Sequence, residues 1–264
     1  MTKQRYSTDL TDAQWKLIRP LLSRETRGRP RRVRQRRIIN ALCYVVSSGV
    51  QWRLLPREFP KWTLVYYYFY YFRRWNRCDF WRRLYHLLRV MLRHKMGRHK
   101  HPTAGCQDSQ SVKTAAGAGV RGFDCGKKIK GRKRHVLSNT QGLPLEILVT
   151  PADVSDTQGA RRLWQKAGRR RGSTQKLRLV WVDGGYKRSV QEWCAAKRGV
   201  RLQVVEKEPG QRGFTVQKRR WVIERTFGWF SAQRRLVKDY EVLTLHSEGL
   251  LWFTAARVVL RRLA

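Results

Sequence analysis

Three acidic residues are set apart by the segments that carry them. Asp183 follows the apolar run LRLVWV and precedes two glycines, which places a carboxylate at the end of an expected strand beside easily bent backbone. Asp108 lies among small side chains in GCQDSQSVKT, and Glu224 lies in the helical stretch RRWVIERTFGWF. Two strand-end aspartates and a glutamate on a later helix can converge to bind hard cations through oxygen. Such a site suits phosphoryl transfer assisted by two metal ions.

The charge balance bears on the role of these acids and on the kind of partner that the protein binds. The chain has 58 Lys and Arg against 18 Asp and Glu, a formal net charge of +40. Most acids are therefore expected to be salt-bridge partners of cations, which is also the plain alternative for a single glutamate such as Glu224. The charge itself predicts a polyanionic partner, and nucleic acid fits best because its phosphates bind Lys and Arg spread along a chain.

Other classes of protein fit the sequence less well. No uncharged apolar run reaches membrane-spanning length and the first residues lack a signal-peptide core, so we expect a soluble intracellular protein. No GxSxG elbow accompanies a placed histidine and acid, which disfavours a serine nucleophile. Five cysteines form no CxxC pair, which disfavours disulfides and zinc: Cys43, Cys78, Cys106, Cys125 and Cys194.

The first hundred residues have helical patterning. Thr11 and Gln14 form a predicted capping box, and apolar spacing from Arg34 to Ser48 predicts a helix ended by Gly49 in a left-handed cap. Further helices are expected from Thr63 and from Asp79. Because helices flank the segment Gln51-Trp52-Arg53, we predict an all-α, helix-turn-helix-like DNA-binding domain over residues 1–100.

After residue 100 the pattern changes to strands and then to alternating strands and helices. RHVLS and LPLEILVT, joined by NTQG, have hairpin chemistry, and LRLVWVD and VRLQVVEK read as strands separated by a helix. This alternation predicts an α/β layer fold over residues 101–264. The amphipathic C-terminal stretch is expected to pack as core.

The same segments carry a family resemblance along the whole chain. The stretches GRPRR, SGVQWRLLPREFPKW, DSQSVKT, VWVDGGY and RRWVIERTFGWFSAQRRLVKDYE resemble bacterial insertion-sequence transposases of the IS-five family, within the DDE superfamily. The resemblance implies a ribonuclease H-like catalytic domain with a mixed five-stranded sheet and flanking helices. Asp108 would end the first strand, Asp183 the fourth, and Glu224 would lie on the last catalytic helix. These three acids would bind two Mg²⁺ or Mn²⁺ ions.

The resemblance also implies that the protein acts on double-stranded DNA in the bacterial cytoplasm, associated with the nucleoid. It would bind the terminal inverted repeats of an insertion sequence, cleave the ends and transfer 3′-hydroxyls into target DNA, as a homodimer in the synaptic complex. Arg220, four residues before Glu224, would hold a phosphate near the metal ions. Seven residues after Glu224 the superfamily has a lysine where this chain has Ser231, so Arg234 or Arg235 would replace it.

Basic segments supply the expected DNA contacts. The loop around Gly28-Arg29-Pro30 resembles an AT-hook core, and a phosphate-binding loop without base readout fits equally well. The cations before and within the strand ending in HVLS should follow the DNA backbone. The predicted contacts are Arg27, Arg29, Arg31, Arg32, Arg53, Lys113, Lys127, Lys128, Arg132, Lys133, Arg134, Arg220, Arg225 and Arg234.

Two other functions are compatible with these features. A DNA-binding regulator or architectural protein would use the acids only to balance charge and would not cleave DNA. A ribonuclease H-like junction nuclease would cut branched DNA without joining ends.

Overall fold

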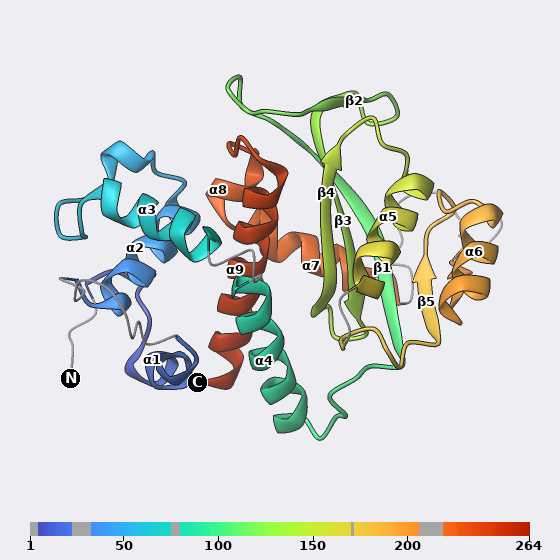
Figure 1. Ribbon diagram of the computed structural model, residues 1–264, viewed down its shortest axis with the longest axis horizontal. Coiled ribbons are helices and arrows are strands. Elements are labelled where there is room, and N and C mark those ends of the chain that lie inside the picture. Colours follow the sequence, from blue (N-terminus) through green and yellow to red (C-terminus); the bar gives the residue numbers. More distant parts are fainter. Residues whose placement is uncertain (1–4, 23–32, 75–79, 170–171, 206–218) are drawn as a thin grey trace.

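The computed structural model describes residues 5–22, 33–74, 80–169, 172–205 and 219–264 (Figure 1). Its helices are α1 (Asp12–Ile18), α2 (Gln35–Ser48), α3 (Trp62–Arg74), α4 (Phe80–Lys95), α5 (Asp156–Arg169), α6 (Arg188–Arg198), α7 (Trp221–Ser231), α8 (Arg234–Val237) and α9 (Thr244–Leu263), with short 3-10 turns at Arg19–Leu21 and Trp52–Leu54. Its strands are β1 (Ala104–Lys113), β2 (Gly122–Asp124), β3 (Ile129–Asn139), β4 (Pro144–Pro151), β5 (Leu179–Val182) and β6 (Arg201–Val204).

The strands form one mixed sheet. β1 pairs antiparallel with β3, which pairs antiparallel with β4, whereas β1, β5 and β6 run parallel to one another. In the described residues the sheet has six strands, one more than expected, because the short β2 adds to the start of β3. The hairpin of β3 and β4 and the strands β5 and β6 match the predicted pattern.

Helices cover both faces of the sheet. On one face, Gln107 of β1 accepts a hydrogen bond of 2.8 Å from Trp164 of α5, within an apolar cluster that includes Val190 of α6. On the other face, Cys106 packs in a second cluster with Phe227 of α7 and residues of α9. Side chains alternate between faces along a strand, so Asp108 points toward the α7 side.

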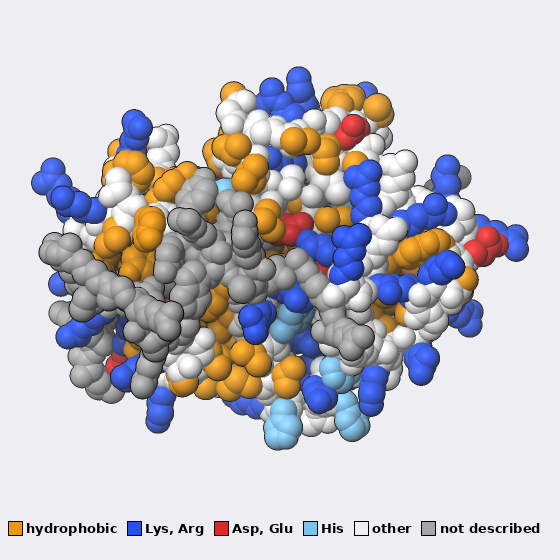
Figure 2. Space-filling view, in the orientation of Figure 1, with side chains coloured by type: hydrophobic (Ala, Val, Ile, Leu, Met, Phe, Trp, Pro, Cys, Tyr) orange, Lys and Arg blue, Asp and Glu red, His pale blue; other side chains and the backbone are white. Residues whose placement is uncertain are grey.

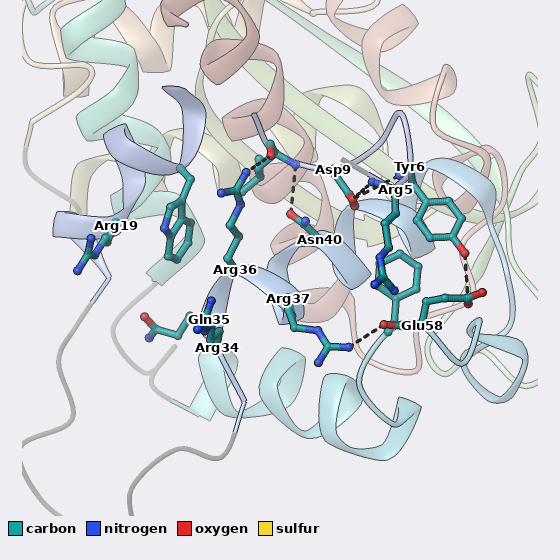
Figure 3. A pocket seen from close by; sticks show the side chains of 13 residues that line it. Arg5, Tyr6, Asp9, Arg19, Arg34, Gln35, Arg36, Arg37, Asn40 and Glu58 are labelled. Atoms are coloured by element: carbon teal, nitrogen blue, oxygen red, sulfur yellow. Dashed lines mark hydrogen bonds between the residues drawn. The ribbon is translucent and has the colours of Figure 1, made fainter. Parts of the chain in front are cut away.

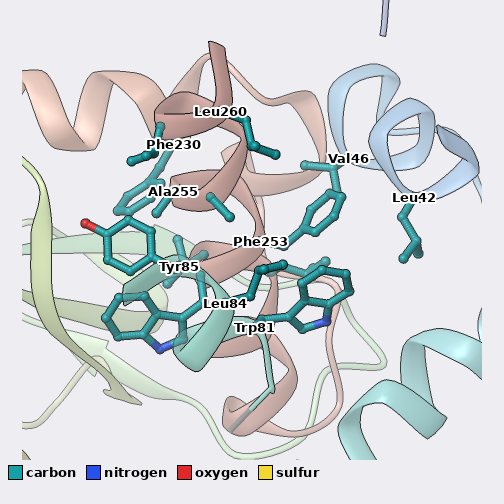
Figure 4. Packing of buried hydrophobic residues seen from close by; sticks show 14 of the residues in the cluster. Leu42, Val46, Trp81, Leu84, Tyr85, Phe230, Phe253, Ala255 and Leu260 are labelled. Carbon is teal, nitrogen blue, oxygen red and sulfur yellow. The ribbon is translucent and has the colours of Figure 1, made fainter. Parts of the chain in front are cut away.

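The N-terminal helices share a core with the C-terminal helix α9. In this cluster Trp81 of α4 meets Phe253 of α9 at a ring distance of 4.8 Å, and Leu42 of α2 belongs to the same buried set (Figure 4). Figure 1 shows α9 between the N-terminal helices and the sheet. The C-terminal stretch is therefore core, as predicted, and the regions before and after residue 100 are joined through one hydrophobic cluster.

The helix start predicted at Thr11 and the helix end predicted at Gly49 are both confirmed. Thr11 accepts from the Gln14 backbone and Gln14 accepts from the Thr11 backbone, so the capping box is present. Gly49 ends α2 with φ of 72°, a conformation in which glycine avoids a Cβ clash. The helical region is thus confirmed, whereas a helix-turn-helix arrangement within it stays a prediction. The predicted helix start at Asp79 lies outside the described residues.

Candidate active site and nucleic-acid interface

Two of the three predicted acids meet where β1 and β5 run side by side. The parallel register pairs Cys106 with Trp181, and Asp108 and Asp183 each follow two residues later. Both carboxylates face the guanidinium of Arg220, whose Nη2 lies 3.5 Å from Asp108 Oδ2 and 4.0 Å from Asp183 Oδ2. The register of two neighbouring strands thus gathers acids that are far apart in the sequence.

Asp108 does not end its strand, contrary to expectation. It is the fifth residue of β1, which continues to Lys113 because β3 supplies an antiparallel partner along that whole stretch. The Asp108 side chain is 14% exposed. Burial and the nearby charge of Asp183 raise the pKa of Asp108 to about 6, against the lowering effect of the Ser109 N–H and of Arg220.

Asp183 lies in the turn that follows β5 and is more open to solvent. Its side chain is 32% exposed, and its Oδ1 accepts a hydrogen bond of 3.0 Å from the N–H of Gly185. Asp183 was expected to end the fourth strand and instead follows the fifth strand in chain order, because the short β2 adds one strand before it. Its predicted place at a strand end is correct.

Glu224 lies on α7, one turn after Arg220, and is exposed. α7 packs against the same face of the sheet as Asp108, and Gln110 of β1 donates a hydrogen bond of 3.3 Å to Ser231 near the end of this helix. Within the described ranges no three His, Cys, Asp or Glu residues are grouped so that they could hold a metal ion. The structure therefore brings the two aspartates together and leaves Glu224 outside their cluster.

The turn before α7 fixes the position of Arg220. Arg219 has a positive φ of 75°, an uncommon conformation for a residue with a side chain. Its carbonyl accepts a hydrogen bond of 3.2 Å from the Cys106 thiol, and its guanidinium lies 4.6 Å from the centre of the Trp181 ring. These contacts attach the turn to β1 and β5, the two strands that carry the acids. The sequence patterns gave no sign of this role for Arg219.

The aspartate pair has the chemistry of a divalent-cation site. Both residues offer oxygen ligands, which Mg²⁺ and Mn²⁺ prefer. A cationic group already lies between them in the form of the Arg220 guanidinium, and burial and the charge of Asp183 still raise the pKa of Asp108. The residues present therefore fit a divalent metal ion.

The predicted DNA contacts fall into three groups. The exposed ones are Arg53, Lys113, Lys127, Lys128 and Arg234. Four lie outside the described residues: Arg27, Arg29, Arg31 and Arg32. The remainder, which are partly or fully buried, make internal contacts. Figure 2 shows Lys and Arg side chains spread over much of the visible face, with few acids among them.

Three consecutive cations of β3 are buried instead of facing DNA. Arg132 is 0% exposed, Arg134 1% and Lys133 6%. Arg132 donates to the carbonyl oxygens of Glu241 and Val242 and lies 3.2 Å from Asp239, which ties the sheet to the α8–α9 connection. The prediction that these three follow the DNA backbone does not fit such burial, because strand side chains point to the two faces of the sheet and both faces are covered at these positions. We leave them out of the proposed DNA surface.

Other residues near α7 also have structural partners. Arg225 donates to the Gln141 carbonyl at 2.9 Å and lies 4.5 Å from the centre of the Trp221 ring. Arg235 is buried and forms an ion pair of 2.8 Å with Glu241, so it is a poor replacement for the lysine of the superfamily. The exposed neighbour Arg234 keeps that role as a candidate.

His135 belongs to the interior of the protein. Its Nε2 lies 3.0 Å from the Thr150 hydroxyl, and burial lowers its pKa to about 4. This environment matches a hydrogen-bonded strand histidine and does not favour a proton-transfer group.

An arginine-lined pocket between α1 and the start of α2 was not predicted (Figure 3). It encloses about 770 Å³. Arg19 and Arg34 line it and are exposed, whereas Arg36 binds Asp12 and Arg37 donates to the Glu58 carbonyl. Spacing alone did not reveal this pocket, because its cations come from segments separated in the chain.

The fold and the acids together indicate a class of enzyme, and comparison with known proteins identifies the family. A mixed sheet with an aspartate pair on neighbouring strands and a glutamate-bearing helix is an arrangement suited to nucleic-acid phosphoryl transfer. Residues 99–256 match the family described as "Transposase DDE domain", so this chain belongs to the DDE transposases. This family implies the ribonuclease H-like fold. Residues 10–85 match the family described as putative transposases of the IS4/5 family, which confirms the resemblance found in the sequence.

A curated relative is similar to part of the chain. The "Putative transposase for insertion sequence element IS402" from Burkholderia cepacia is 32% identical over 115 residues, which are 42% of this chain and 54% of that protein. The chain therefore matches about half the length of this relative. In the described residues, no helix is both long and apolar enough to cross a membrane.

Proposed function

We propose that this protein binds the terminal inverted repeats of an insertion sequence, cleaves the element ends and transfers the 3′-hydroxyls into target DNA. The observation that carries the proposal is the Asp108–Asp183 pair around Arg220. Membership of the DDE transposases and the large positive charge agree with it.

Asp108 and Asp183 would hold a divalent cation through their carboxylate oxygens, and Glu224 would complete the set if α7 brings it closer when DNA binds. Two such ions, when bound, would activate the attacking oxygen and stabilise the leaving one. Asp108 must be ionised for this task, and a pKa of about 6 leaves it so near neutral pH.

Arg220 has a second task in this proposal. Its guanidinium faces both aspartates, and a bound cation would compete with it for their oxygens. A guanidinium displaced from the carboxylates can bind a phosphate through paired N–H donors. The exposed cations Arg53, Lys113, Lys127, Lys128 and Arg234, together with Arg19 and Arg34 of the pocket, would hold the flanking duplex.

The substitution Asp183→Asn tests the metal role. It keeps the size of the side chain and removes its charge, so we expect DNA binding to persist while cleavage in Mg²⁺ or Mn²⁺ falls at least about 100-fold. The measurement is a denaturing gel of labelled element ends with and without metal. Glu192→Gln is the matched control, since Glu192 is an exposed acid on α6 that pairs with Arg188.

Cleavage by Asp183→Asn at the rate of the control would refute the metal role. A wild-type protein that binds the ends and never cuts them would instead favour the regulator. A strand-transfer assay separates the transposase from a junction nuclease, which would cut branched DNA without joining ends.

A further inference from the structure

A fourth acid lies beside the aspartate pair. Asp156 is the first residue of α5, and its Oδ1 accepts a hydrogen bond of 2.6 Å from the hydroxyl of Ser109. Ser109 directly follows Asp108 on β1, and its N–H donates to Asp108 Oδ1 at 2.7 Å. One serine thus connects the carboxylates of two acids, one on each face of the strand.

The second oxygen of Asp156 is directed toward Asp183. A Cβ atom placed on Gly185 would lie 3.6 Å from Asp156 Oδ2 and 3.1 Å from Asp183 Oδ1. Both carboxylates therefore border the same small space, which the absence of a side chain at residue 185 leaves open.

The charge of Asp156 is only partly balanced. Lys133 lies 3.5 Å from Asp156 Oδ1, and the same ammonium lies 3.4 Å from Asp124. Because one buried ammonium group pairs with two carboxylates, it neutralises the charge of Asp156 only in part. The remaining negative charge lies on the side of Asp156 that faces Asp183.

Tyr186 is a buried residue next to the Asp183 turn. The residue is 1% exposed, and in the described part of the chain its hydroxyl has no hydrogen bond of standard geometry, although Gln107 is near. Its N–H donates to the Asp183 carbonyl at 3.3 Å, so this buried side chain is attached to the turn that carries Asp183.

We propose that Asp156 is an outer acid of the metal site. Ser109 and Lys133 hold its Oδ1, and its Oδ2 attracts the water bound to a divalent cation at Asp108 and Asp183. This assignment rests on the proposed function. It gives the site an acid from α5 in addition to those from the sheet and from α7.

The test is a calorimetric titration of the full chain with Mn²⁺. Asp156→Asn keeps an oxygen for the Ser109 hydrogen bond and removes the charge, so we expect the Mn²⁺ affinity to fall about 10-fold to 100-fold. The matched control is Asp153→Asn, which removes an exposed acid three residues earlier. Asp183→Asn is titrated alongside to report on the proposed function itself.

The outcomes separate the two proposals. If Asp183→Asn weakens Mn²⁺ binding and Asp156→Asn binds like Asp153→Asn, the assignment of Asp156 is wrong and the proposed function stands. If wild type binds no Mn²⁺, both fail. Should Asp156→Asn not fold, Asp156→Ser removes the charge with a smaller polar side chain. An Mn²⁺ affinity equal to that of Asp153→Ser would then overturn the assignment.

Discussion

At the scale of single residues, the pair of Asp108 and Asp183 lowers the stability of the fold, and the sheet holds both residues in place. Asp108 is largely buried beside a second carboxylate, and its pKa stays raised even in a chain of net charge +40. The ionised form is therefore less stable in the folded protein than in the unfolded chain. Residues kept in such an environment are candidates for function.

This environment predicts a pH-dependent stability. In the folded protein the pKa of Asp108 is raised from 3.8 to about 6. Ionised Asp108 therefore destabilises the fold: this loss of stability is absent below pH 3.8 and complete above about pH 6. Without metal, Asp108→Asn should therefore raise the free energy of unfolding at pH 7.5 by about 1–3 kcal/mol and by less at pH 4.5. Urea unfolding at both pH values measures this, and an equal gain at both would contradict it.

Sequence context singled out Asp108 and Asp183 and gave no sign of the role proposed for Asp156. The first two are marked by a nearby strand or by glycines, which are local signals. Asp156 opens a helix, where an acid is ordinarily explained by the helix dipole. Its link to the site comes from the Ser109 hydroxyl and the space at Gly185, both of which exist only after the sheet and α5 pack together.

At the scale of elements, β3 is the clearest case of a pattern that local reasoning misjudged. Its cations were read as DNA contacts, because charged side chains are rarely buried. β3 lies inside the sheet with both faces covered, so Arg132 and its neighbours had to find internal partners. Helix caps and strand ends could be predicted, since they depend on a few adjacent residues. The position of a strand within a sheet depends on the whole chain.

The buried arginine gives a prediction about stability. Arg132→Met removes the ion pair with Asp239 and the donors to two carbonyl groups, so we expect a loss of about 3–5 kcal/mol in the free energy of unfolding. Lys130→Ala, at an exposed position of the same strand, should change it by no more than about 0.5 kcal/mol. Urea unfolding measures both. Unchanged stability of Arg132→Met with weaker DNA binding would restore the DNA-contact interpretation.

At the scale of the whole molecule, charge should control assembly. A net charge of +40 makes two free copies repel each other, and a duplex that binds both would neutralise much of that repulsion.

We therefore predict a monomer in the absence of DNA and a homodimer on paired element ends, where two cleavages must be coordinated. Light scattering of the free protein and of the active complex tests this, with a duplex of unrelated sequence as the control. An active complex that contains one copy would contradict the prediction.

The central position of α9 has a consequence for how the chain acquires its structure. Ribosomes make α9 after every other described element, yet it supplies the surface on which α4 packs and part of the core beneath the sheet. During translation the apolar surfaces of the earlier helices and of the sheet that α9 covers stay exposed to solvent until α9 has been synthesised. An unfinished chain should therefore be a good chaperone client and a poor DNA-binding fragment.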